Sequence, residues 1–158
     1  MFKKIMIPLD GSQIAECVLP HLQNLTRPDE PTEILLFEIC EPPVILADFP
    51  ATLTEDWDDH VRKETAHMQQ QCSLYLNQIA QRIAMSGVTV TSKTAVGKAA
   101  ELIVDYAVQN QVDLILMATH GRSGIMRWAY GSTADRVLRA SPVPVMIVRP
   151  EECKIGNG

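Results

Sequence analysis

The segment Val112–Gly121, which reads VDLILMATHG, decides the fold class of this chain. Its apolar part, Val112–Met117, is typical of a buried strand in a parallel sheet. The small residues that follow it predict a tight turn at the carboxyl end of that strand. Nine residues separate this segment from Gly131–Thr133, which lies at the start of a predicted helix. Because parallel sheets bind ligands at their carboxyl edge, we expect a binding site between the turn and the helix.

The turn and the helix start are suited to binding one anion. Gly121 and Gly124 permit positive φ and close approach of the backbone, and Ala118 is small enough to keep the turn tight. Ser132 and Thr133 place amides and hydroxyls at a helix N-terminus, where the dipole favours an anion by roughly 0.3 to 1 kcal/mol. The spacing also fits a plain turn in which Ser132 caps the helix. A Walker A loop is excluded, because no lysine precedes Ser132.

The rest of the chain alternates predicted strands with predicted helices. Apolar runs predict strands over residues 3–9, 34–39, 88–96, 112–117 and 143–148. Helical spacing predicts helices over residues 12–25, 54–87, 99–109 and 132–140, with a bend at Pro20 and a loop over 44–53. The polar face of the 88–96 strand indicates a sheet edge. This order predicts a doubly wound, five-stranded, Rossmann-like α/β fold.

Length and charge narrow the class of protein. A chain of 158 residues is expected to form one domain over residues 1–150, followed by a short tail over 151–158. The net charge of −5 provides no basic stripe, so neither nucleic acid nor an anionic membrane surface is an expected partner. The sequence contains no apolar run of membrane-spanning length, and a cytoplasmic location is the expectation.

The cysteines and histidines do not form a recognisable site. The cysteines at 17, 40, 72 and 153 lack C-x-x-C spacing, so we expect reduced thiols rather than disulfides or zinc ligands. His60, Glu64 and His67 share one face of the predicted long helix, which is expected to be solvated and to bind no metal. No G-x-S-x-G elbow or Cys-His arrangement is present, so no nucleophile is nominated.

Three segments in order resemble the universal stress protein family. The ATHG turn and the GST at 131–133, followed by PVPVMIV over 142–148, are similar to that family's glycine motif and last strand. The opening IMIPLDGS, residues 5–12, resembles its first strand and turn. VGKAAELI, residues 96–103, resembles the start of its third helix. The resemblance covers nearly the whole chain and implies a fold like that of the adenine nucleotide alpha hydrolases.

The resemblance to the ATP-binding branch of the family implies a phosphate site. In that branch the motif is G-x-x-G, nine residues, then G-[ST]. Carried over, Gly121, Gly131 and Ser132 bind the phosphates, with Thr133 alongside. Ala118 departs from the pattern, because it stands where that branch has its first glycine and adds a methyl group.

The resemblance also implies an adenosine site. Pro8 and Asp10 are expected to line it, with the Asp10 carboxylate accepting from ribose hydroxyls or the adenine amino group. From the residues alone, Asp10 is a turn residue that helps to cap the first helix. Backbone groups near Glu38 and Ile39, at the end of the second strand, are expected at the adenine edge. Met117 is expected on the ring, and His120 is expected in the turn, donating to the ligand or the backbone.

These expectations lead to one leading function and its alternatives. The resemblance implies an ATP-, ADP- or AMP-binding protein, with or without Mg²⁺, in stress response or signalling, with at most slow ATP hydrolysis. It also implies a homodimer through the last strand, burying Val145, Ile147 and Val148. The alternatives are a structural or interaction module of the same fold without nucleotide, and an adenylyl-transfer enzyme.

Overall fold

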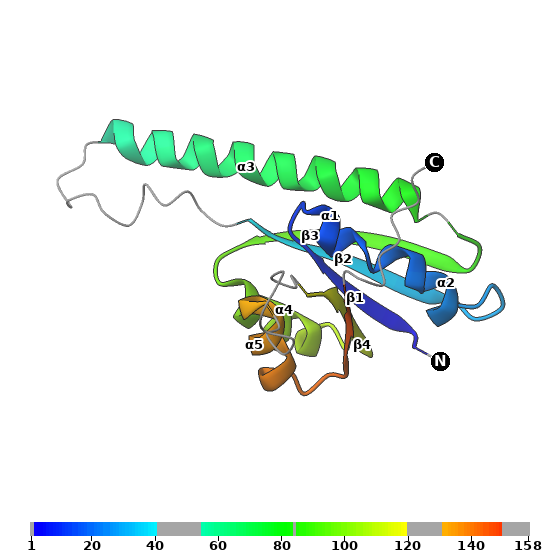
Figure 1. Cartoon of the computed structure of the whole chain (residues 1–158). Helices are drawn as coiled ribbons and strands as arrows, with labels where there is room; N and C mark the ends of the chain where they lie inside the picture. The colour runs from blue at the N-terminus through cyan, green and yellow to red at the C-terminus, as the bar shows by residue number, and fades with distance from the viewer. Residues whose placement is uncertain (1, 41–54, 84, 120–130, 150–158) are drawn as a thin grey trace.

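The computed structural model describes residues 2–40, 55–83, 85–119 and 131–149, with the backbone alone at 55–58 and 60. Within these ranges, five strands form one sheet in the order β3-β2-β1-β4-β5 (Figure 1). The strands are β1 (Lys4–Leu9), β2 (Thr32–Cys40), β3 (Val88–Val96), β4 (Leu114–Ala118) and β5 (Val145–Val148). All four pairings are parallel, which confirms the predicted sheet.

Helices cover both faces of the sheet. The helical elements are α1 (Gln13–Glu16), the 3₁₀ turn η1 (Leu19–His21), α2 (Leu22–Leu25), α3 (Glu55–Arg82), α4 (Ala99–Gln109) and α5 (Ser132–Ala140). In Figure 1, α1, α2 and α3 lie on one face, and α4 and α5 lie on the other. Each face has its own core, with Leu36 and Leu76 in the first and Phe37 and Ile103 in the second. Successive side chains of a strand therefore pack into the two different cores, which explains why the strands are continuous apolar runs in the sequence.

The first predicted helix is broken rather than bent. Ser12 caps α1, since its Oγ accepts a hydrogen bond from the Ala15 N–H at 3.1 Å. Pro20 then lies in the first positions of η1, where its missing N–H is tolerated. Residues 12–25 consequently form three short helical pieces instead of one helix.

The long helix α3 is shorter and less buried than predicted. It ends at Arg82 rather than near Gly87. Gly87 has φ +78° and turns the chain into β3, and a Cβ there would approach the Pro28 carbonyl oxygen to 2.8 Å. Leu76 and Ile79 are buried, but none of the side chains described between residues 59 and 71 is. Figure 1 shows the reason, because the amino-terminal turns of α3 extend beyond the sheet.

The later elements follow the sequence prediction closely. The bounds of β3, α4 and α5 are those predicted, and β3 is an edge strand. The last strand is shorter, because β5 begins at Val145 instead of Val143. Pro144 has no N–H to give to a ladder, although its carbonyl accepts from the Ile115 N–H at 2.9 Å.

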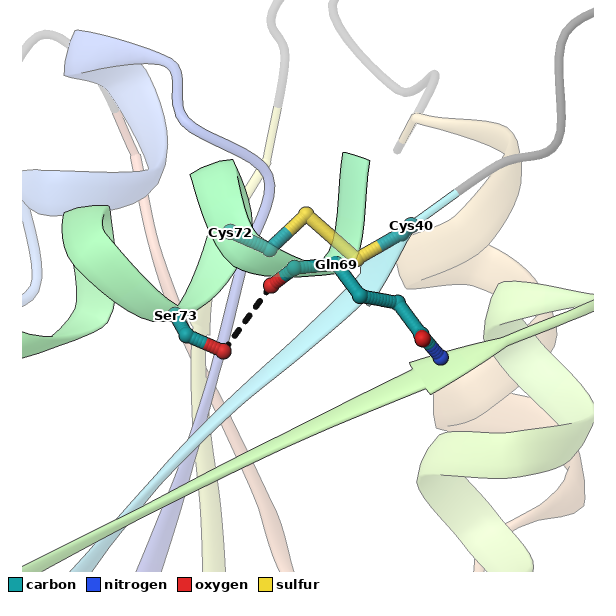
Figure 2. Close-up of a disulfide and its surroundings, with 4 residues drawn as sticks. All are labelled: Cys40, Gln69, Cys72 and Ser73. Carbon is teal, nitrogen blue, oxygen red and sulfur yellow. Dashed lines mark hydrogen bonds between the residues drawn. A yellow bond between two sulfur atoms is a disulfide. The ribbon is translucent and has the colours of Figure 1, made fainter. Parts of the chain in front are cut away.

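The expectation of reduced thiols is wrong for the described cysteines. Cys40, at the end of β2, forms a disulfide with Cys72 of α3, and their Cα atoms are 6.8 Å apart (Figure 2). Cys17 is not a free thiol either. Cys153 lies outside the described residues. Cys40 and Cys72 are 32 positions apart without a local pattern, so only the packing of α3 over β2 brings them together.

Candidate functional site

The carboxyl ends of β1 and β4 lie where the strand order reverses. From β1 the chain adds β2 and β3 on one side, and then β4 and β5 on the other. The bridges between β1 and β4 pair Ile5 with Leu114 and Met6 with Ile115, in the amino-terminal halves of both strands. A reversal of this kind forms a crevice at the carboxyl ends of the two central strands.

Pro8 limits hydrogen bonding between the carboxyl ends of β1 and β4. The Lys3 carbonyl accepts from the Glu33 N–H, next to β2, at 2.8 Å, and the Lys4 carbonyl accepts from the Asp113 N–H, next to β4, at 2.9 Å. Backbone groups of successive residues point to opposite sides of a strand, so the groups of residue 8 point towards β4. Pro8 has no N–H to donate there. The β1–β4 ladder is therefore weakened where the sequence predicts adenosine.

Asp10 begins a tight turn at the end of β1. Its Oδ1 accepts a hydrogen bond from the Ser12 N–H at 3.0 Å. Gly11 between them has φ +75°, a conformation that glycine adopts without steric cost. The interpretation of Asp10 as a turn residue is therefore correct locally, although Ser12 supplies the helix cap. The Asp10 side chain is also exposed, directly after the carboxyl end of β1.

The Glu38 side chain is a feature that the sequence did not reveal, since only its backbone was predicted to matter. Glu38 is 7% exposed, and its Oε2 is buried without a hydrogen-bond partner among the described residues. It occupies the even-numbered face of β2, with Leu36, beneath α3. Burial, together with a smaller contribution from the charge of Asp10, raises the pKa of Glu38 from 4.5 to about 7. A buried acid beside a ligand crevice is a common property of functional sites.

Thr119 joins the end of β4 to the start of α5. It is 5% exposed, and its N–H donates to the Val148 carbonyl at 3.1 Å. Its Oγ1 accepts from the Gly131 N–H at 3.2 Å. Gly131 is the N-cap of α5, so this hydrogen bond positions the amino end of α5, with Ser132 and Thr133, beside β4. Thr119 was not among the predicted site residues, although a hydroxyl residue directly after a buried strand is a usable signal.

The other predicted site residues either pack in the two cores or lie outside the described residues. Met117 is 6% exposed and packs in the core on the α4 and α5 side. Ala118 is half-buried and packs against the opposite core. His120, Gly121 and Gly124 lie outside the described residues. The structure therefore brings the ends of β1, β2 and β4 and the start of α5 to one edge of the sheet. The predicted glycine turn between β4 and α5 lies outside the described residues.

The described part of the chain holds neither a cluster of metal ligands nor a membrane-spanning helix. No group of three or more His, Cys, Asp or Glu residues there is arranged to hold a metal ion. Glu64 and His67 of α3 are exposed, and the side chain of His60 lies outside the description. No described helix has the length and apolar character needed to cross a membrane.

A parallel sheet whose strand order reverses at β1 and β4, covered by helices on both faces, defines a doubly wound, Rossmann-like α/β protein. The model of the universal stress protein family matches residues 1–149. The chain therefore belongs to the universal stress protein family.

Two relatives come from Methanocaldococcus jannaschii. Universal stress protein MJ0531 is 26% identical over 149 residues, which cover 94% of this chain and 83% of that protein. Universal stress protein MJ0577 is 26% identical over 158 residues, with 94% of this chain and 96% of that protein covered.

Solved structures show the same fold. The structure of MJ0577 superposes with a TM-score of 0.78 at 24% identity, covering 94% of this chain and 96% of that chain. A universal stress protein in complex with cAMP superposes with a TM-score of 0.64 at 21% identity, covering 93% of this chain and 97% of that chain. An Arabidopsis thaliana member of the family with AMP bound has a TM-score of 0.62 at 16% identity, with 93% and 91% covered. At these identities the likeness concerns the fold.

Proposed function

We propose that this protein binds an adenine nucleotide, ATP, ADP or AMP, in the crevice between the ends of β1 and β4. In this proposal it acts in stress response or signalling rather than as an efficient enzyme. The observation that carries the proposal is the hydrogen bond from the Gly131 N–H to Thr119 Oγ1, because it holds the amino end of α5 at the strand reversal. Neighbours of the same fold with cAMP and with AMP bound support it.

The phosphate end of the ligand lies at the start of α5. The first amides of a helix lack partners within the helix and attract anions. Ser132 is exposed and Thr133 half-buried, so their hydroxyls add donors at that end. Gly121 completes this half of the site in the proposal, with Ala118 and His120 in the connecting turn. Mg²⁺, where present, binds the phosphates, since this is its usual mode in nucleotide sites.

The adenosine end of the ligand lies at the ends of β1 and β2, near Pro8. Asp10 is an exposed carboxylate, which suits the ribose hydroxyls as donors. The unpartnered Oε2 of Glu38 fits the same chemistry, because a buried acceptor is stabilised by a donor such as the adenine amino group. Met117 packs beneath the ring in this proposal.

Thermal unfolding with AMP, ADP and ATP, each with and without Mg²⁺, tests the proposal against the alternative of a module that binds no nucleotide. Ligand at 100 times its dissociation constant stabilises the folded state by about 2.7 kcal/mol, so the melting temperature rises. GTP and GMP serve as controls for the base. A melting temperature that no adenine nucleotide changes contradicts the proposal and favours the module. Phosphate release from ATP is expected to be slow.

The homodimer through β5 belongs to the same proposal, in a corrected form. β5 is an edge strand, with Val145 and Ile147 half-buried and Met146 38% exposed. Val148 is 1% exposed and lies in the chain's own core, so the expectation that it packs across a twofold axis is wrong. Met146 takes its place in the proposed interface. The cytoplasmic location stays a prediction.

A further inference from the structure

The amino-terminal half of α3 is held to the sheet by few contacts. None of the described side chains between residues 59 and 71 is buried, and these turns extend past the sheet (Figure 1). The buried side chains of α3, Leu76 and Ile79, lie in its second half. Within the described part of the chain, the first half of the helix therefore has no buried side chain to keep it at the carboxyl end of β2.

The polar contacts between α3 and α1 also follow Cys72 in the helix. The Tyr75 hydroxyl donates to Glu16 Oε1 at 3.2 Å, and Arg82 Nη1 donates to Glu16 Oε2 at 2.6 Å. Cys72 comes one turn before Tyr75, and its bridge to Cys40 reaches the last residue of β2 (Figure 2). The disulfide is therefore the outermost of these attachments of α3.

We propose that the Cys40–Cys72 disulfide is a thiol-exchange site, and that a small-molecule thiol opens it and releases the amino-terminal half of α3. The two sulfurs differ in access, because Cys72 is half-buried whereas Cys40 is 3% exposed. The incoming thiolate consequently attacks Sγ of Cys72. Disulfides in a reducing compartment are usually redox-active rather than permanent, which agrees with this role if the protein is cytoplasmic.

The exchange proceeds in two displacements. The first thiolate forms a bond to Cys72 Sγ, the Cys40–Cys72 bond breaks, and Cys40 Sγ leaves with the electron pair and takes up a proton. A second thiolate then attacks the sulfur of the first thiol in the mixed disulfide, and Cys72 Sγ leaves in the same way. Two thiols are oxidised to their own disulfide, and the bridge gains two electrons and two protons.

The release has a consequence at the carboxyl edge of the sheet, and this step rests on the proposed function. Cys40 follows Glu38 by two residues, so both side chains lie on the α3 face of β2. When the amino-terminal half of α3 moves away, the end of β2 opens to water beside the Glu38 carboxyl group. A solvated carboxyl group binds a ligand donor less strongly than a buried one, so nucleotide affinity falls when the bridge is reduced.

Hydrogen exchange on the whole oxidised protein, before and after treatment with reduced glutathione, tests the inference. Intact mass reports the reduction itself. We expect amides in residues 61–71 to exchange about tenfold faster after reduction, while those of α4 remain unchanged. The C40A/C72A variant should exchange fast in this region with or without glutathione. The C17S variant, which keeps both Cys40 and Cys72, should respond like the wild type.

Three outcomes would overturn the inference: glutathione leaves the bridge oxidised, residues 61–71 keep their protection after reduction, or C40A/C72A still responds. A parallel AMP titration keeps the two proposals apart. A dissociation constant about threefold higher for the reduced protein supports the coupling to the site, and an equal one overturns that coupling. If AMP binds neither form while α3 opens, the nucleotide proposal fails and the exchange site stands.

Discussion

Glu38 is a buried carboxyl group on the face of β2 that also carries the buried apolar side chain of Leu36. Its folded-state pKa of about 7 lies above the ordinary value of 4.5, so the folded protein binds this proton more tightly than the unfolded chain. The stabilisation that comes with the proton is complete below the unfolded pKa. It is lost as the pH rises through the folded pKa.

The Glu38→Gln variant should lose this pH dependence. Between pH 5 and 8, the free energy of unfolding of the wild type should fall by about 2 to 3 kcal/mol more than that of the variant. Urea unfolding at a series of pH values measures the difference. Glu101→Gln, at an exposed glutamate of α4, should keep the wild-type profile. If the free energy of unfolding changed with pH in the same way for the wild type and Glu38→Gln, the Glu38 carboxyl would already be charged at pH 5.

Gly11 provides a second test at the level of one residue. Its φ of +75° is costly for a residue with a Cβ, while the nearest atom to that Cβ, Glu38 Oε1, would be 3.9 Å away. Gly11→Ala should therefore lower the free energy of unfolding by about 1 kcal/mol through backbone strain and not through a clash. Gly11→Asn, which tolerates positive φ better, should lose less. An equal loss in both variants would point to a steric cause.

At the level of elements, the connection between β4 and α5 depends on one hydroxyl group. In Thr119→Val the shape is kept, but the Gly131 N–H loses its partner. We expect a loss of about 1 to 3 kcal/mol in the free energy of unfolding, and weaker AMP binding because the start of α5 is less well positioned. Thr119→Ser keeps the hydroxyl and should bind AMP like the wild type. Normal AMP binding by Thr119→Val would contradict a role of the α5 start in binding the ligand.

The elements differ in how well the sequence predicts them, for physical reasons. β3, α4 and α5 are bounded by local signals such as Gly97 and Ser132, and their periodicity is enough to define them. Pro20 showed that the first helix is interrupted, but not that it breaks into three pieces. The apolar stripe of α3 predicted a helix, but its burial depends on where the sheet ends, which no local pattern encodes.

The same distinction applies to the candidate site. Gly131 could be selected from the sequence because a helix start has a local signature, whereas Pro8 and Asp10 were expected at the site through the family resemblance. The Glu38 side chain, the Thr119 hydrogen bond and the Cys40–Cys72 disulfide could not, since each depends on contacts between segments far apart in the chain.

At the level of the whole molecule, the exposed edge of the sheet predicts self-association. Light scattering should give twice the chain mass of 17.5 kDa. Met146→Glu places a charge on β5 and should shift the protein towards the monomer, because burying an unpaired charge is costly. Leu74→Glu, at a side chain of α3 that is 51% exposed, should leave the dimer intact. A wild-type monomer, or dissociation by Leu74→Glu alone, would contradict an interface at β5.

Calorimetric titration of AMP into the wild type and Gly131→Val tests the nucleotide site itself. Gly131 is the N-cap of α5, and a valine side chain there would fill the space in which the phosphate is proposed to lie. We predict saturable binding with one AMP per chain for the wild type, and none for Gly131→Val with an unchanged circular dichroism spectrum. Wild-type affinity in Gly131→Val, or no binding by the wild type, would contradict a nucleotide site at this edge of the sheet.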